Sequence, residues 1–301
     1  DPAMAKTQGE AALDPANGGL LAENSQNCFV ALNSPTHPLN IIGYEWSDTR
    51  MGAPMESILG GYNDPRLPRY FEPATDASLA GQYKGIRIGI EIDEKSRYDG
   101  HSKLDFYNEN KMQLMVAAES WFLKAEAALR GWANAGNIQT NYETGIERSL
   151  AMYNLSAATA AYINDAVSKP KPYIDPKPVN PGQNNILAGS PYLSTITKKW
   201  DNADNANRKL ERIITQKWIA IFPDGGEAWA EYRRTGYPIL FPVVINKSGG
   251  AIPTLPGVRR IPIPQAEYNT NNGGAKEAET MLGGPNTGAT RLWWDVVNKN
   301  L

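Results

Sequence analysis

The chain has 301 residues, which corresponds to one large domain or two modest ones and is long enough to bury a core without disulfide or metal support. Its 30 Lys and Arg residues are balanced by 32 Asp and Glu residues, and the net charge is −2 with the two signs interspersed. This pattern excludes the basic stripe of a nucleic-acid-binding protein and the polybasic cluster of an anionic-membrane binder, and no apolar run of roughly 18 residues predicts a membrane-spanning helix.

The single cysteine, Cys28, excludes an internal disulfide and a cysteine-based zinc cluster, and we expect it to be a small buried hydrophobic residue. The first residues carry no secretory signal, and the segment before Cys28 lacks the small and aliphatic residues of a lipoprotein cleavage site. Two explanations stay open: a cytosolic chain, or a mature or trimmed product whose targeting segment is gone.

Residues 1–110 are punctuated by proline at short intervals and hold only brief apolar runs. Because proline interrupts both helices and ladders, this region is predicted to form long ordered loops packed on another part of the protein.

An amphipathic pattern begins at Lys111. The apolar residues recur at alternating three- and four-residue steps on one face: Met115, Ala118, Phe122, Ala125, Leu129 and Trp132. A second apolar face is lined by Leu114, Ala117, Trp121 and Ala128. The spacing predicts a helix over 111–132 that is buried between neighbours, since it is apolar on two sides.

A glycine turn at Gly136 separates this helix from a second one, predicted over 140–153, and Ser156 is placed to cap a third over 157–167. Two antiparallel helices joined by a short turn are typical of a helical-hairpin repeat of tetratricopeptide size. The proline-rich segment 168–185 cannot be helical and is predicted to be extended, either as a connector or as a lip that displays Tyr173.

Two further helices are predicted over 204–222 and around 227–234, the second ending at Gly236. The fold class is therefore mainly α, with a tetratricopeptide-like helical-hairpin scaffold and a long loop-rich face. We expect a loop-rich region at 1–110, a helical core at 111–236 and a coil-rich region at 237–301 of the same domain.

Signatures of catalysis are missing from the sequence, including a nucleophile elbow, a zinc-binding His-Glu-x-x-His and a phosphate-binding loop. A glycosidase needs only two carboxylates, and Glu227 and Glu231 lie one helical turn apart. The alternative is structural: Glu227 begins a short helix, and Arg234 is spaced to pair with Glu231. We favour the structural interpretation and expect the protein not to be an enzyme.

Two oxygen-rich stretches, 201–207 and 93–99, do not match the ligand spacing of a calcium loop. We expect no cofactor and no metal site, although a structural calcium stays open as an unsupported alternative.

Aromatic residues in predicted loops are the remaining positive signal: Tyr44, Trp46, Tyr62, Tyr70, Tyr83, Tyr107, Tyr173 and Tyr192. A sugar ring presents an apolar face and hydroxyl edges, which an exposed aromatic ring and neighbouring polar groups complement. Segment 44–50 combines rings, acids and a cation within seven residues, although Tyr44 and Trp46 could instead anchor the loops to the helices. The candidate ligand-binding residues are Tyr44, Trp46, Arg50, Tyr62, Tyr83 and Tyr173.

Four segments together resemble the SusD/RagB family of Bacteroidetes outer-membrane lipoproteins. They are NDPRLPRYF at 63–71, MQLMVAAESWFLKAEAA at 112–128, ITQKWIAIF at 214–222 and EAWAEYRRTGYP at 227–238, supported by RRIP at 259–262. In order and spacing they cover about residues 60–270.

The resemblance implies a nutrient-binding lipoprotein that is anchored at the cell surface and delivers oligosaccharides, or in some members peptides, to a SusC-like TonB-dependent transporter without catalysis. A glycoside hydrolase, or a scaffold that binds only protein, stays as the alternative. The four segments are expected to be framework and assign no binding residue.

Members of the family are usually longer, and the lipid-bearing cysteine and first helical pairs precede the matched part. We therefore expect the C-terminal part of a family member: a fragment, a cleaved product or a chain numbered from mid-protein. A missing N-terminal half would leave a helix face uncovered, so Leu114, Ala117 and Trp121, or the opposite face, are predicted to contact another polypeptide.

Overall fold

The computed structural model describes residues 1–33, 37–106 and 110–296, and this part of the chain is mainly helical. The α-helices are α1 Pro2–Leu13, α2 Pro38–Asn40, α3 Ala53–Gly61, α4 Leu67–Tyr70, α5 Ser96–Asp99, α6 Ala117–Leu129, α7 Ile138–Met152, α8 Thr159–Ile163, α9 Ala206–Ala220, α10 Gly225–Thr235, α11 Gln265–Thr270 and α12 Asn272–Met281. The strands are β1 Cys28–Ala31 and β2 Lys111–Met115. None of the described helices is long and apolar enough to cross a membrane.

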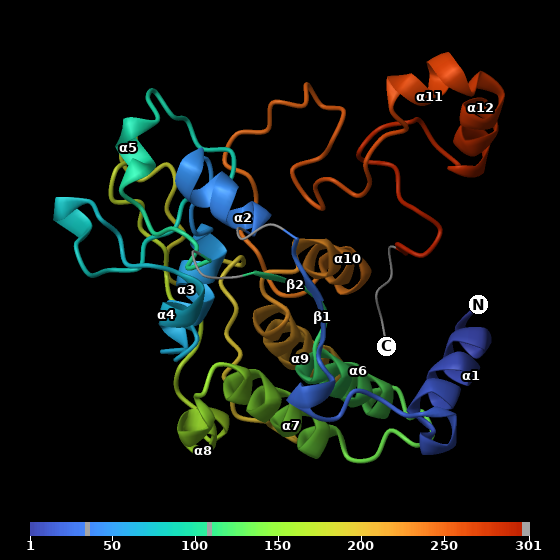
Figure 1. The fold of residues 1–301 in the computed structure, drawn as a ribbon. Helices are drawn as coiled ribbons and strands as arrows, with labels where there is room; N and C mark the ends of the chain where they lie inside the picture. The colour runs from blue at the N-terminus through green and yellow to red at the C-terminus, as the bar shows by residue number, and fades with distance from the viewer. Residues whose placement is uncertain (34–36, 107–109, 297–301) are drawn as a thin grey trace.

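Helices α6, α7 and α9 form the centre of the fold, and α6 packs on both of the others (Figure 1). Their shared core contains Phe122, Ile146 and Ile213, each completely buried. Gly145 of α7 faces the ring of Phe122, and a Cβ atom at this position would lie only 2.8 Å from that ring. The close approach of α6 and α7 therefore depends on a residue without a side chain, and the predicted helical hairpin is confirmed.

The predicted start of the first helix is wrong. Residues 111–115 form β2, which pairs antiparallel with β1, and the helix begins only at Ala117. The backbone N–H of Ala117 donates to Asn27 Oδ1 at 2.7 Å, so the segment next to β1 also caps α6. Leu114 and Met115 fit a helical stripe equally well, and only the distant partner strand decides between the two structures.

The third predicted helix is shorter than expected. It consists of a 3₁₀ turn, Ser156–Ala158, followed by α8, which ends at Ile163. Asp165 accepts hydrogen bonds from the N–H groups of Val167 and Ser168 and turns the chain into the proline-rich segment. That segment is not helical, as predicted, but it bends at 176–180 and turns at 181–184 rather than remaining extended throughout. Tyr173 forms an isolated antiparallel bridge with Ile186.

The region 1–110 contains helices that the proline spacing does not predict. Asp1 caps α1, where Pro2 occupies the first helical position, and this pair of signals was missed. Helix α3 and α4 pack on the end of α9, where the Tyr70 hydroxyl donates to the carbonyl of Ile219 at 3.0 Å. The loops between α4 and Phe106, with α5, gather on one side of the helical core, whereas the segment between α1 and β1 runs beside α6 and α7 (Figure 1).

The C-terminal region also holds two helices, α11 and α12, where mostly coil is predicted. A buried ion pair between Arg259 and Asp295 joins two parts of this region. The region is anchored to α10 by reciprocal hydrogen bonds, in which Arg259 donates to the carbonyl of Arg233 at 2.6 Å and Arg233 donates to the carbonyl of Arg259 at 2.9 Å. The guanidinium of Arg233 lies over the rings of Trp229 and Trp294, at 3.6 and 4.8 Å from their centroids.

Cys28 is exposed, which contradicts the prediction of a buried residue. All four residues of β1 are exposed because the sheet has two strands and no further layer covers this edge. The thiol therefore belongs to the surface rather than to the core.

Candidate functional site

The motif residues that carry the family resemblance are buried framework. Arg66 and Asp64 form a completely buried ion pair with Nη2–Oδ2 at 2.7 Å, and the same guanidinium donates to Ser149 Oγ and the Tyr162 hydroxyl. Burial by itself would raise the pKa of Asp64, but the charge and hydrogen bonds of Arg66 outweigh it and lower the pKa. This network joins α4, α7 and α8, and so it holds the loops on the helices.

A second buried network surrounds Lys217 of α9. Its ammonium lies 2.7 Å from Glu227 Oε1 and 2.9 Å from Glu231 Oε1, and 3.3 Å from Glu119 Oε1. Arg234 pairs with Glu231 as the spacing predicts, at 2.7 Å. Glu227 and Glu231 are thus bound to one buried cation between helices, an arrangement that favours a structural cluster.

The predicted binding residues fall into three groups. Tyr62 and Tyr173 are 1% and 0% exposed, and their hydroxyls donate to the carbonyls of Ile196 and Gly85. Their rings anchor α3 and the proline-rich segment to the core, so they offer no free face to a ligand. Among the loop aromatics, Tyr107 lies outside the described residues.

Tyr44 and Tyr83 form the second group and are both half-buried beside Asp105. The Tyr44 hydroxyl donates to Glu72, and Lys103 lies over its ring at 5.6 Å. Burial, with the charge of Asp105, raises the pKa of Tyr83, and burial also raises the pKa of Asp105. Both tyrosines therefore remain protonated and able to donate a hydrogen bond at neutral pH.

Trp46 and Arg50 form the third group. Arg50 lines a surface hollow of about 340 Å³, and Trp46 does not line it but directly precedes Ser47, which does; we call it the Trp46 hollow. The hollow is lined by Ser47, Asp48, Arg50, Ile86, Ile92, Asp93, Glu94, Lys95, Tyr98 and Asp99. The side chain of Trp46 is 60% exposed, and its backbone carbonyl accepts a hydrogen bond from Lys95 Nζ at 3.0 Å. In the sequence, the exposed Trp46 therefore comes directly before the first lining residue of a hollow that combines apolar and charged side chains.

Arg50 holds this loop rather than pointing to solvent. Its Nε and Nη2 donate to the carbonyl of Asp99 at 3.0 and 2.8 Å, and its Nη1 donates to the carbonyls of Ser47 and Thr49. All three nitrogens are engaged, so Arg50 acts as a clamp between the Trp46 loop and the end of α5. The groups that can meet a ligand are instead Asp48, Lys95 and the acids at 93 and 94.

Electrostatically the Trp46 hollow is acidic. Its lining contains four carboxylates, from Asp48, Asp93, Glu94 and Asp99, against the two cations Arg50 and Lys95. A hydrogen bond from Arg97 lowers the pKa of Asp93 to about 2, so this carboxylate stays ionised at any physiological pH. The sequence does not predict that Asp48, Asp93 and Lys95 line one hollow, because loops carry no periodicity that places them together. The role of Trp46 stays a prediction.

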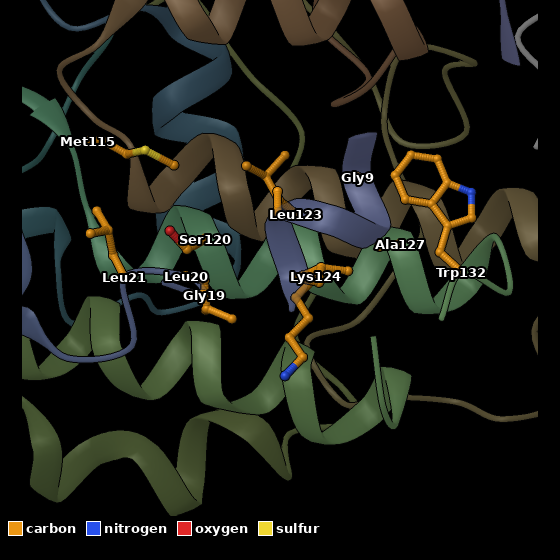
Figure 2. Close-up of a pocket in the computed structure, with 12 residues that line it drawn as sticks. Gly9, Gly19, Leu20, Leu21, Met115, Ser120, Leu123, Lys124, Ala127 and Trp132 are labelled. Atoms are coloured by element: carbon orange, nitrogen blue, oxygen red, sulfur yellow. The ribbon is translucent and has the colours of Figure 1, made fainter. Parts of the chain in front are cut away.

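A different pocket, of about 360 Å³, lies between α1 and α6 (Figure 2). Figure 2 labels Leu123 and Trp132 on its α6 side, and among its lining residues only Ser120 and Lys124 have polar side chains. A sugar needs several converging polar groups, so this pocket lacks the chemistry of a glycan site.

The N-terminal segment lies against the helix face that the sequence predicts to be uncovered, the face of Leu114, Ala117 and Trp121. Ala117 is completely buried, and the indole N–H of Trp121 donates to the carbonyl of Ala22 at 3.0 Å. The chain's own N-terminal segment thus covers most of that face, while Leu114 remains 51% exposed. Contact of this face with another polypeptide stays a prediction.

The fold is a helical-repeat scaffold that carries long loops, one of which borders the Trp46 hollow. A family model described as "SusD-like: Susd and RagB outer membrane lipoprotein" matches residues 1–295. The chain therefore belongs to the SusD-like family, whose members are outer membrane lipoproteins. No curated protein matches the chain.

Solved structures agree with this assignment. A chitin-binding SusD homologue from Flavobacterium johnsoniae is 44% identical with a TM-score of 0.93, and the match covers 100% of this chain and 60% of that one. A SusD homologue from Bacteroides vulgatus is 35% identical with a TM-score of 0.91, again over 100% and 60% of the two chains. A SusD-like protein from Bacteroides thetaiotaomicron is also 35% identical, with a TM-score of 0.89 over 98% and 60%. The chain spans about 60% of the length of these relatives.

Proposed function

We propose that this chain is the part of a cell-surface nutrient-binding protein that holds an oligosaccharide at the Trp46 hollow and does not transform it. The observation that carries the proposal is the 60% exposed side chain of Trp46, whose backbone carbonyl is bonded to Lys95 of a hollow lined by that ammonium group and four carboxylates. Sugar rings stack on an indole through their C–H faces, and carboxylates and Lys95 are suited to bind their hydroxyls.

The charge of the hollow supports a neutral ligand. Both lining cations already have partners, since Arg50 is bound to Asp99 and Lys95 to Asp48 at 2.9 Å. An acidic sugar would therefore meet an excess of carboxylates, which repel it. A neutral oligosaccharide is favoured, and the same acidity makes a basic peptide the second candidate.

The chitin-binding relative suggests the first ligand to test. Oligosaccharides of chitin are neutral and carry both the hydroxyl groups and the apolar ring faces that this hollow complements. The 44% identity over the whole chain supports the comparison.

The test is calorimetric titration of the chain with oligosaccharides of chitin, with acidic oligosaccharides and with a basic peptide. We expect binding of the chitin oligosaccharide and no heat from the acidic one. Reducing ends measured after long incubation should not increase, because a binding protein leaves the glycan intact. Binding of the peptide alone would replace the glycan proposal, and release of new reducing ends would favour a glycoside hydrolase.

We propose that the whole protein is a lipoprotein anchored in the outer membrane. It would carry this binding surface and deliver the bound ligand to a SusC-like TonB-dependent transporter. The family description supports this placement. Affinity purification of the tagged full-length protein from outer membranes should recover a transporter barrel, and recovery of the protein without one would contradict it. No cofactor or metal is required, so treatment with a chelator should leave binding unchanged.

A further inference from the structure

A second hollow lies on the other side of α5 from the Trp46 hollow. Its volume is about 610 Å³, and it is lined by Glu94, Ser96, Arg97, Pro176, Lys177, Pro178 and Pro181. We call it the proline hollow. Glu94 lines both hollows, while Lys95 and Tyr98 face the first and Ser96 and Arg97 face the second. The short segment 93–99 is thus a shared wall between them.

Resting on the proposed function, we infer that the proline hollow is a second subsite for the same ligand, and that the protein binds the interior of an extended neutral oligosaccharide that crosses α5. A ligand confined to the Trp46 hollow would contact only one side of this wall. A longer chain would contact both sides of the wall in one binding event.

The chemistry of the proline hollow suits a sugar ring. Three proline rings provide rigid apolar surface for the C–H faces, and Ser96, Arg97 and Lys177 provide donors for the hydroxyl groups. Because it lacks an aromatic ring, this hollow is expected to bind more weakly than the Trp46 hollow. The proline hollow is expected to increase the affinity for a ligand that already stacks on the indole of Trp46.

The shared wall is fixed from both sides, so the two hollows keep a constant relative position. On the near side Arg50 binds the carbonyl of Asp99. On the far side the Tyr98 hydroxyl donates to Asp175 Oδ2 at 2.8 Å and lies 3.0 Å from the carbonyl of Lys177, the residue that lines the proline hollow. Arg97 Nε also donates to Asp93 Oδ1 at 2.6 Å, across the wall. A preformed pair of subsites lowers the ordering cost of binding a long ligand.

The experiment is a titration of the chain with chitin oligosaccharides from the disaccharide to the hexasaccharide. We expect the affinity to rise at least about tenfold over the series, beyond the statistical gain from repeated units, because the second subsite fills only in longer ligands. The double variant Pro178→Ala, Pro181→Ala should lose most of this gain and bind the disaccharide as the native chain does. A second variant, Ser96→Leu, tests the same point by filling the hollow from the exposed start of α5 without adding an aromatic ring or a hydrogen-bonding group.

The outcomes separate the two proposals. An affinity that is the same for short and long ligands, or variants that bind the long ligand normally, would overturn the second subsite and leave the Trp46 site standing. Variants that weaken the binding of short and long ligands equally would also overturn the second subsite, because the loss of affinity would then not depend on ligand length. Failure of every length to bind the native chain would overturn the proposed function and this inference together.

Discussion

Arg50 donates two hydrogen bonds to the backbone carbonyl of Asp99, at 2.8 and 3.0 Å, and thereby ties the loop that carries Trp46 to the end of α5. A cation at the C-terminal end of a helix satisfies carbonyls that have no partner within the helix. The side chain that sequence reasoning placed among the ligand contacts is therefore a positioning residue.

Replacing Arg50 by Met should weaken oligosaccharide binding about three- to tenfold without removing any ligand contact, because the Trp46 loop would have to be ordered on binding. Hydrogen exchange should increase at residues 45–50 and at α5 in the free variant. Unchanged hydrogen exchange together with unchanged oligosaccharide affinity in Arg50→Met would contradict the role of Arg50 as a clamp.

Trp46→Ala should cost about 1–3 kcal/mol of binding free energy, the usual loss when a central aromatic contact is truncated. Trp293 is the matched control, because it is 86% exposed and lies in the C-terminal region, far in sequence from the segment 44–50 and from the lining residues of both hollows. Calorimetry of both variants is decisive: equal affinities for Trp46→Ala and Trp293→Ala would remove Trp46 from the site.

Arg66→Ala should destabilise the fold by about 3–5 kcal/mol, because it leaves the fully buried Asp64 carboxylate without its counter-ion. The control is Lys6→Ala, whose exposed pair with Glu10 spans 3.7 Å and should contribute less than about 1 kcal/mol. Urea unfolding of the two variants measures the difference. Similar midpoints for both would mean that the Asp64–Arg66 network does not hold the loops on the helices.

His101 gives a pH dependence of stability. It is 1% exposed, its ring lies against Tyr98, and neither ring nitrogen has a hydrogen-bond partner among the described residues. Burial lowers its pKa from about 6.5 to about 4, so the unfolded chain takes up the proton first. The native state is favoured above the unfolded pKa, and stability falls as the pH drops from about 6.5 towards 4.

Between pH 7 and pH 5 this loss should amount to about 1–2 kcal/mol. His101→Phe should remove most of it, since a phenyl ring keeps the contact with Tyr98 and cannot be protonated. Unfolding curves at the two pH values test this, with His37→Asn as the control for the other histidine. An unchanged pH dependence in His101→Phe would assign the effect to other groups.

The helical scaffold could be predicted from the sequence, while most of the binding surface could not. Helices α7, α9 and α10 follow from apolar spacing and cap residues, because these are local signals. The strand at 111–115 was read as helix, since its partner β1 is distant in sequence. Helix α1 was missed although Asp1 and Pro2 mark its start.

Trp46, Tyr62 and Tyr173 are candidates because each is an aromatic residue in a predicted loop. Trp46 is exposed and stays a candidate, whereas the core buries Tyr62 and Tyr173. The sequence around these three residues does not encode their exposure, which depends on how the loops fold back on α3 and the helices. Asp48 and Lys95 come from loops 47 residues apart and meet only in the folded chain.

The most direct test of the account is a crystal structure of this chain with a bound chitin oligosaccharide. We predict that a sugar ring stacks on the indole of Trp46 and that its hydroxyls reach Asp48 and Lys95. Sugar density in the apolar pocket between α1 and α6, with Trp46 bare, would contradict the assignment of the site.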